Sequence, residues 1–484
     1  MAAFGAFVLG QGAWVYGSTE QARHEHEAKL KEIQEWQDAF VATAPRASQA
    51  LEKLGNIDKA VLGWLNKDFD NTNGEVERFA TEWNQLKLKR CLEVVPFIPN
   101  QQVAATLLRL LYKKTGIAIE QGTDALYHSL WREQETVKLD DPSYADFKAV
   151  LYRGIDPRFS EYFGHDKESS INLSEVRWGG VERDGIPPLR QPKMIKAGAA
   201  DYLNDSDIIF GLEIKGDARA YPKRILAWHE MITDEIGGRP IAGVYCTLCG
   251  TMIPYDCEVD GKTYLMGTSG FLYRSNKLMY DKQTKSLWST ASGEPVIGAL
   301  VGRKIKLGSC PVVTTTWKQW KQLHPDTSVL SLDTGYSRDY GEGVAYKNYF
   351  ATDELMFTVQ AFDSTLPNKA EVLVLPWATH NTAISTTLLK SHPIYQAKVD
   401  HKPILILTDK TGANRVYRTE VWFTNLVTDT VLLDKSGRKW NVEEAYIQCQ
   451  STKERASRLP AHRAFWFGWH AAYPKGLLIS NFIP

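Results

Sequence analysis

The spacing of hydrophobic residues changes near residue 170, and this change limits the folds that the chain can adopt. Between about Gln21 and Asp141, apolar residues recur at helical spacing. The clearest run is Leu30, Ile33, Trp36 and Phe40. After about residue 170, short β-type runs alternate with turn residues. The sequence therefore predicts an α+β protein, with a helical module at about 20–150 and a β-rich domain at about 175–484.

Glycine-containing turns divide the second part of the chain into hairpins. Asp260-Gly261 lies between two β-type runs and is the strongest signal for a type I′ turn. Lys215-Gly216-Asp217 and Asp409-Lys-Thr-Gly412 mark two further hairpins in the same way. Strands at this spacing favour a mainly antiparallel domain of the sandwich or barrel-like kind.

The charge balance and the cysteine content restrict the classes of function. Lys plus Arg and Asp plus Glu each number 57, so the formal net charge is zero and no basic field attracts nucleic acid. Six cysteines in 484 residues are too few for a disulfide scaffold. We therefore expect no nucleic-acid partner and a small-molecule substrate, whose identity the sequence does not give.

The N-terminal segment at residues 1–19 carries no charge, and the first charged residue is Glu20. The segment is shorter than the ~20 residues that a membrane-spanning helix needs, and it lacks the basic start of a signal peptide. We interpret it as a signal anchor, with Trp14 and Tyr16 at the membrane interface. This interpretation places the protein outside the cytoplasm, membrane-anchored or periplasmic. The alternative is a buried or disordered terminal segment.

The sharpest motif is Tyr245-Cys246-Thr247-Leu248-Cys249-Gly250, which lies between two strand-like runs. In thioredoxin-like enzymes, a helix begins at the first cysteine and lowers its pKa. Here the residues after Gly250 include Pro254 and show no helical pattern. The other interpretation is a metal-binding turn, which aims two thiolates at one ion. We therefore predict that Cys246 and Cys249 bind a metal.

A turn of this kind supplies two ligands, and His229 is the nearest candidate for a third. Imidazole combined with two thiolates suits a copper or a zinc ion. Three protein ligands leave one coordination position open, which favours catalysis over a purely structural role. The other interpretation of His229 is a core histidine whose ring is hydrogen-bonded by a backbone carbonyl.

Three residues near these ligands are candidates for catalytic roles, namely Tyr245, Arg274 and Glu230. Trp288 is a further candidate for shaping a pocket. Adjacent side chains diverge on a strand and on a helix, so Glu230 is not expected to orient His229. Asp281, Asp339 or a backbone carbonyl would take that role. The loop at 333–341 has glycine near both ends and either folds over a pocket or lies on the surface.

The order of these motifs resembles a bacterial and archaeal family known as domain of unknown function 3179. The segments that carry the resemblance are Asp184-Gly-Ile-Pro-Pro-Leu, Ala220-Tyr-Pro, Trp228-His229-Glu230, Tyr245-Cys-Thr-Leu-Cys-Gly, Gly270-Phe-Leu-Tyr-Arg-Ser-Asn, Met279-Tyr-Asp, Leu287-Trp288-Ser, His324-Pro-Asp-Thr, Arg338-Asp-Tyr-Gly and Ala464-Phe-Trp-Phe-Gly-Trp. The resemblance covers about residue 180 to the C-terminus, and it implies an exported or membrane-anchored protein. It transfers no activity. The usual form of the motif is Cys-Pro-x-Cys, whereas this chain has Thr247 in place of the proline.

Three functions follow from these observations. The first is an extracytoplasmic metalloprotein, a copper- or zinc-dependent oxidoreductase whose metal is held by Cys246, Cys249 and His229. The second is a non-catalytic metal-binding or carrier protein that uses the same ligands. The third is a structural or interaction module in which Cys246 and Cys249 form a disulfide.

Overall fold

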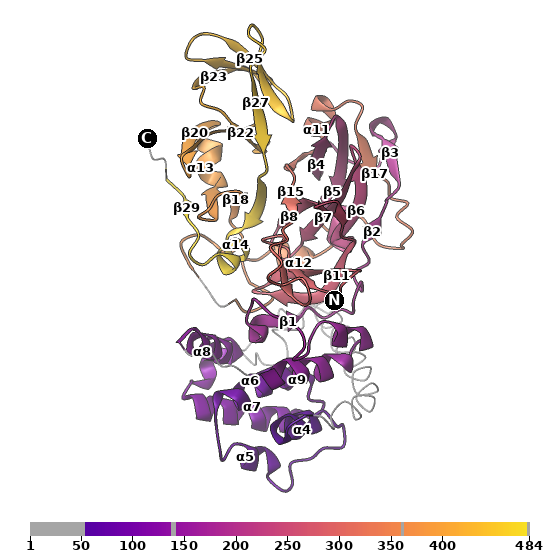
Figure 1. The fold of residues 1–484 in the computed structure, drawn as a ribbon, viewed down its shortest axis with the longest axis vertical. Helices are drawn as coiled ribbons and strands as arrows, with labels where there is room; N and C mark the ends of the chain where they lie inside the picture. Colours follow the sequence, from indigo (N-terminus) through magenta and orange to yellow (C-terminus); the bar gives the residue numbers. More distant parts are fainter. Residues whose placement is uncertain (1–53, 137–141, 360–362, 482–484) are drawn as a thin grey trace, which may run out of the picture.

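The computed structural model describes residues 54–136, 142–359 and 363–481. The predicted anchor at residues 1–19 and the predicted helical run from Leu30 to Phe40 lie outside these ranges. Within them, no helix combines the length and the apolar character that crossing a membrane requires. A helical region lies at one end of the molecule, and the β-rich region occupies the rest (Figure 1).

The helical region follows the pattern that the sequence predicts. Its helices are α4 (Asn56–Gly63), α5 (Glu75–Phe79), α6 (Gln85–Val94), α7 (Gln101–Thr115), α8 (Gly122–Thr136) and α9 (Pro142–Arg153). In α7, the apolar residues Val103, Leu107 and Leu111 share one buried face. The Asn100 side chain accepts hydrogen bonds at the start of α7, and Gly116 ends the helix with a positive φ.

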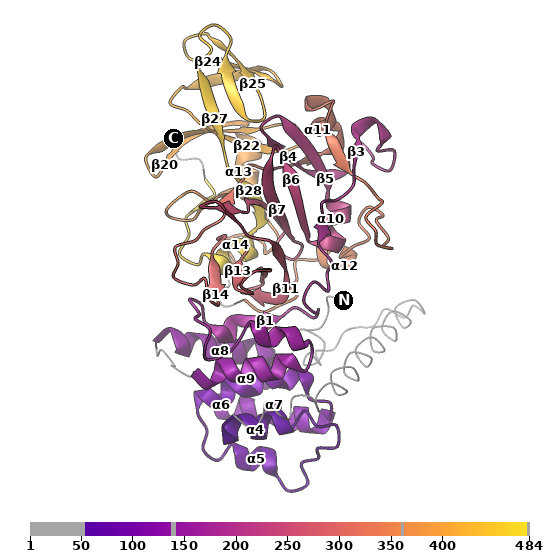
Figure 2. The same cartoon turned by 45° about the vertical axis from the view of Figure 1, so that its right-hand side comes forward.

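The helical region packs against the first sheet, and Figures 1 and 2 both show it beside β1. In sheet order the strands are β1 (Val176–Trp178), β11 (Met266–Tyr273), β12 (Asn276–Asp281), β13 (Leu287–Ser289) and β14 (Pro295–Ile297). Phe271 of β11 inserts among Tyr152, Phe159 and Phe163, with ring centroids 4.8–5.0 Å away. The helices and this sheet therefore share one hydrophobic core.

Two further sheets enclose the core that positions the cysteines. The first has the order β16 (Val313–Thr316), β4 (Ile208–Ile214), β5 (Asp217–Pro222), β17 (Ser328–Leu330) and β3 (Met194–Lys196). The second has the order β15 (Gly308–Ser309), β8 (Thr251–Asp256), β7 (Arg239–Cys246), β6 (Met231–Ile236) and β2 (Leu189–Arg190). Ile225 and Leu226 of α10 (Lys223–His229) pack with Phe210 and Ile241 in the core between them.

The C-terminal part forms two more sheets. One has the order β28 (His462–Phe465), β18 (Glu371–Leu375), β19 (Thr382–Ser385) and β29 (Leu478–Ile479). The other has the order β20 (Ile394–Val399), β21 (Lys402–Thr408), β22 (Asn414–Arg418), β27 (Arg455–Leu459), β26 (Tyr446–Cys449), β25 (Lys439–Val442), β24 (Val431–Asp434) and β23 (Phe423–Thr428). Leu388 and Leu389 of α13 (Thr386–Ser391) pack in the core between these sheets.

These two parts repeat one topology, and we call them the first repeat (208–330) and the second repeat (371–479). In both, a central hairpin gains an antiparallel strand on one edge and a parallel strand on the other, in the orders β16-β4-β5-β17 and β28-β18-β19-β29. In both, a short helix follows the hairpin and leads into two strands joined by a two-residue turn with positive φ, Gly237-Gly238 or Asp400-His401.

A sequence signal accompanies the repeated topology. The helices α11 (Trp317–Leu323) and α14 (Trp466–Ala472) both follow the pattern Trp-x-x-Trp-x-x-x-His/Tyr-Pro. Both end in the same backbone conformation, at His324 and at Tyr473. Because the two copies lie about 150 residues apart and share few other residues, the sequence analysis above did not detect the repeat.

The predicted fold class is confirmed as a helical N-terminal region followed by a mostly antiparallel β-rich region. The predicted type I′ turn at Asp260-Gly261 is also confirmed. Both residues have positive φ, and they join β9 (Glu258–Val259) to β10 (Lys262–Thr263). Lys215-Gly216 makes the equivalent turn between β4 and β5.

Candidate functional site

The Cys-x-x-Cys motif forms the turn between two strands. Cys246 ends β7 and pairs with Thr251, the first residue of β8. No helix follows the motif, in agreement with the sequence. Gly250 has a φ of 58°, and a Cβ there would lie 2.8 Å from the Phe465 ring, so the turn requires glycine. The backbone N–H of Phe465 donates to the Cys249 carbonyl over 2.7 Å, which places the C-terminal segment on the turn.

The turn brings the two cysteine sulfur atoms to within 2.6 Å of each other, but their surroundings differ. Cys246 is 2% exposed and lines a pocket. Cys249 is fully buried, and its Sγ lies 3.3 Å from the carbonyl oxygen of Ser275. Helix α14 covers Cys249 at Gly468, where an added Cβ would lie 3.4 Å from the sulfur atom. A molecule that enters the pocket therefore meets Cys246 first.

The two thiols also differ in acidity. Burial opposes ionisation of Cys246, but hydrogen bonds from the Cys249 thiol and from the backbone N–H groups of Lys277, Cys249 and Leu248 outweigh it and lower its pKa. Burial raises the pKa of Cys249, and the hydrogen bond to Cys246 and the charge of that sulfur raise it further. Of the two thiols, Cys246 is therefore the more acidic and Cys249 the less acidic.

The pocket beside Cys246 has about 60 Å³ of space for water-sized groups, several times what one water molecule needs. Its apolar wall comes from Phe271 and Leu272 of β11 and from Met356 and Phe357. Its polar wall comes from Glu230, Thr247, Lys277 and Tyr346. The site is therefore a small pocket that joins one thiol to several polar groups.

An ion pair forms part of the polar wall. Lys277 Nζ contacts Glu230 Oε2, and the Tyr346 hydroxyl donates to Glu230 Oε1 over 3.1 Å. Both charged side chains are at most 8% exposed. Burial lowers the pKa of Lys277 to about 7, because removal from water favours the neutral amine. Contact with the Glu230 carboxylate favours the ammonium and opposes this effect of burial.

Thr247 and Tyr245, which flank Cys246, each carry a buried hydroxyl without a hydrogen-bond partner among the described residues. Thr247 is one of the residues that line the pocket. Tyr245 instead lies in the core of the first repeat, where its ring packs against Phe210 at a centroid distance of 5.0 Å. Of these two residues, Thr247 is placed to meet a ligand and Tyr245 is placed to support the strand.

In the structure, His229, the predicted third metal ligand, forms hydrogen bonds with other residues. Its Nδ1 lies 2.9 Å from the Pro187 carbonyl oxygen, and its Nε2 lies 2.6 Å from the Tyr340 hydroxyl. Across residues 54–136, 142–359 and 363–481, no group of three or more His, Cys, Asp or Glu side chains is placed to hold a metal ion. The described residues thus do not assemble the Cys246, Cys249 and His229 set. They match the other interpretation, a core histidine bonded by a backbone carbonyl.

Glu230 points away from His229, which confirms the prediction that it does not orient the imidazole. Helix α10 ends at His229, and Glu230 takes a left-handed conformation with a φ of 56°. This conformation turns the two side chains apart, so that Glu230 enters the pocket of Cys246 while His229 faces Pro187. The loop at 333–341 covers His229, with the Tyr336 ring 5.2 Å from the imidazole centroid.

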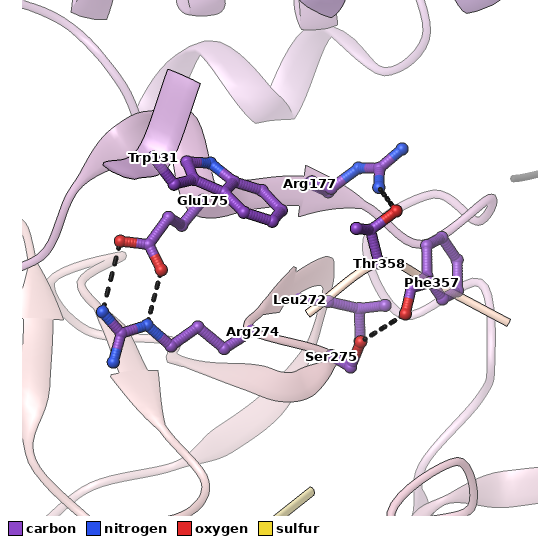
Figure 3. Close-up of a pocket in the computed structure, with 8 residues that line it drawn as sticks. All are labelled: Trp131, Glu175, Arg177, Leu272, Arg274, Ser275, Phe357 and Thr358. Atoms are coloured by element: carbon purple, nitrogen blue, oxygen red, sulfur yellow. Dashed lines mark hydrogen bonds and ion pairs between the residues drawn. The ribbon is translucent and has the colours of Figure 1, made fainter. Parts of the chain in front are cut away.

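Arg274 and Trp288 lie outside the pocket of Cys246. Arg274 pairs with Glu175 at a second, very small pocket between the helical region and β11 (Figure 3). This pocket has about 10 Å³ of space, close to the minimum for one water molecule. The Trp288 indole is fully buried and donates to Asp281 Oδ2 over 3.0 Å. Neither residue therefore lines the pocket of Cys246.

The sequence analysis missed Lys277 as a site residue and missed the hydroxyl of Thr247. The signal for Lys277 was a charge directly before the apolar run Leu278-Met279-Tyr280, since lysine is almost never fully buried unless it is paired. The partner, Glu230, lies 47 residues earlier in the chain, so no local pattern could identify the pair.

The comparisons with known proteins agree with the order of motifs in the sequence. Searches of the curated proteins and of the solved structures returned no match. One family model matches residues 183–476, which include the first repeat, the second repeat except its last strand β29, and the whole pocket of Cys246 except Gly179 and Val181. The chain therefore belongs to the family described as "Protein of unknown function (DUF3179)".

Proposed function

We propose that this protein is a thiol–disulfide oxidoreductase in which Cys246 is the nucleophile and Cys249 is the resolving cysteine. One observation carries the proposal: the two sulfur atoms are adjacent, yet Cys246 faces a pocket while Cys249 is sealed beneath α14. A nucleophile must be accessible and ionised, and a resolving thiol must lie close to it. The two cysteines meet these separate requirements.

The proposed reaction moves two electrons from the dithiol to a substrate. The Cys246 thiolate attacks an electrophilic atom of the substrate, a bond from sulfur to that atom forms, and the bond between that atom and its neighbour breaks, with the electron pair on the departing neighbour. The Cys249 thiol then attacks the Cys246 sulfur, a Cys246–Cys249 disulfide forms, and the attached group leaves with the electron pair of the broken bond. The Cys249 thiol releases its one proton in this second step, because Cys246 reacts as the thiolate. The raised pKa of Cys249 keeps it protonated until Cys246 has reacted.

This proposal keeps the oxidoreductase class expected from the sequence and replaces its metal by a thiol pair. The described residues do not provide the third ligand that the Cys2His hypothesis needs. The hydrogen bonds that hold Cys246 come from backbone N–H groups of the turn and of Lys277, and they stabilise a thiolate without an ion. We therefore assign no step to a metal.

The test is to trap the two states of the pair. The full chain is reduced with dithiothreitol, exposed to an oxidant, and alkylated under denaturing conditions before peptide mass analysis. We expect a Cys246–Cys249 disulfide after oxidation and its loss in Cys246→Ser and Cys249→Ser. Cys257→Ser is the matched control, because burial raises the pKa of that thiol to about 12.

The proposal would be contradicted if the wild-type protein held about one metal ion per chain and Cys246→Ser held none. That result would restore the metal hypothesis. Elemental analysis of the same preparations provides that measurement. Persistence of both free thiols after every oxidant would likewise contradict it.

A further inference from the structure

We infer that the substrate of this dithiol is a small hydroperoxide, bound by the Thr247 hydroxyl and protonated by the Lys277–Glu230 pair. This inference rests on the proposed thiol chemistry and adds the class of oxidant. Three features of the pocket carry it: its size, an unpartnered hydroxyl beside the nucleophile, and a proton donor on the polar wall.

The size of the pocket favours a substrate of few atoms. Cys246 is 2% exposed, and the pocket beside it has about 60 Å³ of space for water-sized groups. A disulfide in a polypeptide brings two side chains and their backbone to the attacking sulfur, with Cα atoms usually 4.4–6.8 Å apart. Such a group is larger than the space that the pocket leaves beside Cys246. The reactive part of a hydroperoxide is two oxygen atoms, which matches this space better.

The Thr247 hydroxyl is a hydrogen-bonding group without a partner among the residues that the structure describes. Thr247 is buried and lines the pocket next to Cys246. Buried polar atoms in folded proteins nearly always have partners, so a molecule bound in the pocket can supply the partner that this hydroxyl lacks. A peroxide oxygen accepts a hydrogen bond, and a threonine hydroxyl donates one.

The Lys277–Glu230 pair supplies the proton that a peroxide requires. The leaving group of a peroxide is an alkoxide or hydroxide, which is far more basic than the thiolate released from a disulfide, and it needs an acid at the site. Lys277 Nζ is held by Glu230 on the wall of the pocket, and the Lys277 backbone N–H also donates to the Cys246 sulfur. One residue thus contacts the nucleophile through its backbone and presents an ammonium to the pocket.

The proposed reaction with a hydroperoxide conserves atoms and electrons at each step. The Cys246 thiolate attacks one oxygen of ROOH, an S–O bond forms, and the O–O bond breaks with its electron pair on the leaving oxygen. The Lys277 ammonium protonates that oxygen, which yields ROH and a Cys246 sulfenic acid. The Cys249 thiol then attacks the Cys246 sulfur, the disulfide forms, and the hydroxyl leaves as water with the thiol proton. An external dithiol reduces the disulfide and completes the cycle.

The experiment compares two oxidants on the pre-reduced full chain. Rapid-quench alkylation measures the second-order rate of Cys246–Cys249 disulfide formation with hydrogen peroxide and with bis(2-hydroxyethyl) disulfide. We expect the peroxide to react faster, and we expect Thr247→Val to slow the peroxide by about 10-fold, the loss of one hydrogen bond, while the disulfide rate is unchanged. Thr247→Ser should restore the peroxide rate. Thr382→Val is the matched control, because its hydroxyl is also buried and unpartnered among the described residues but lies on β19.

Each alternative result overturns a different statement. Faster reaction with the disulfide, or an unchanged peroxide rate in a folded Thr247→Val protein, overturns the hydroperoxide inference while the dithiol function stands. No disulfide with either oxidant overturns both. Thermal unfolding of each variant establishes that it is folded, and Thr247→Ser decides the question if the valine variant is not.

Discussion

The two repeats share a topology and differ at one turn. In the first repeat, the turn between β7 and β8 carries Cys246 and Cys249. In the second repeat, the equivalent turn between β21 and β22 is Asp409-Lys-Thr-Gly412-Ala413. There Asp409 Oδ1 accepts hydrogen bonds from the Thr411 N–H at 2.9 Å and from the Ala413 N–H at 3.1 Å. The carboxylate closes its own turn, so this turn stabilises the fold and offers no reactive group.

The comparison also explains His229. Helix α10 of the first repeat ends at His229, and helix α13 of the second repeat is followed at its end by His392. His392 Nδ1 lies 3.1 Å from the Leu388 carbonyl oxygen. A histidine at this point thus also occurs in the repeat that lacks the Cys-x-x-Cys motif, where it contacts backbone. Its position therefore belongs to the repeated architecture.

The largest expected effect is a difference in activity between variants of the two turns. Cys246→Ser should lower the rate of substrate reduction by on the order of 10³-fold or more, because it removes the nucleophile. Asp409→Asn changes the equivalent turn and should leave that rate within about twofold, because it lies outside the pocket. Steady-state assays with an external dithiol measure both. A comparable loss in Asp409→Asn would mean that the second repeat takes part in the reaction.

The next effect compares the buried charges of the two repeats. Glu230 has one ammonium partner, Lys277, whereas Glu444 is contacted by the guanidinium groups of Arg415 and Arg458. Lys277→Met should therefore cost about 3–5 kcal/mol of unfolding free energy, because a buried carboxylate loses its cation. Arg415→Met should cost less, since Arg458 still balances Glu444.

Urea unfolding measures both values. The double variant Glu230→Gln with Lys277→Met is the control, and it should recover most of the loss. If Lys277→Met alone unfolds at the wild-type urea concentration, the pair does not exist as an ion pair in the folded protein.

A smaller effect compares the glycines of the two turns. Gly250 and Gly412 both have positive φ, so alanine is strained at each by roughly 1–2 kcal/mol. A Cβ at Gly250 would also meet the Phe465 ring at 2.8 Å, whereas a Cβ at Gly412 would meet the flexible end of Lys390 at 3.0 Å. Gly250→Ala should therefore be less stable than Gly412→Ala by about 1–3 kcal/mol, the usual cost of overpacking. Equal melting temperatures would show that Phe465 does not press on the cysteine turn.

The structural features that the sequence predicted correctly are those that depend on neighbouring residues. The two-residue turn at Asp260-Gly261, the helix at 101–115 and the absence of a helix after Gly250 each follow from a few adjacent side chains. The rest depends on contacts between distant segments. The pairing of Lys277 with Glu230 and the cover of Cys249 by Gly468 join residues that lie 47 and 219 positions apart. His229 and Glu230 are adjacent in sequence but do not share a site, because the left-handed conformation of Glu230 turns their side chains apart.

The smallest expected effect concerns the acidity of Cys246, measured against Cys449 of the second repeat. Because the thiolate is the reactive form, alkylation of Cys246 should rise with pH and level off at a lower pH than for a free cysteine. Replacement of Cys249 by alanine removes a hydrogen-bond partner that lowers the pKa of Cys246, so this pKa should rise and alkylation should level off at a higher pH. Burial opposes ionisation of Cys449, but hydrogen bonds with Ser451 and Thr452 lower its pKa to about 7. This value does not depend on Cys249, so the pH profile of Cys449 should be unchanged in the variant.

Peptide mass analysis after iodoacetamide pulses at a series of pH values measures both sites in one sample. A Cys246 profile that does not move in Cys249→Ala would assign the low pKa to the backbone N–H groups of the turn alone, and the two thiols would then act independently until oxidation joins them.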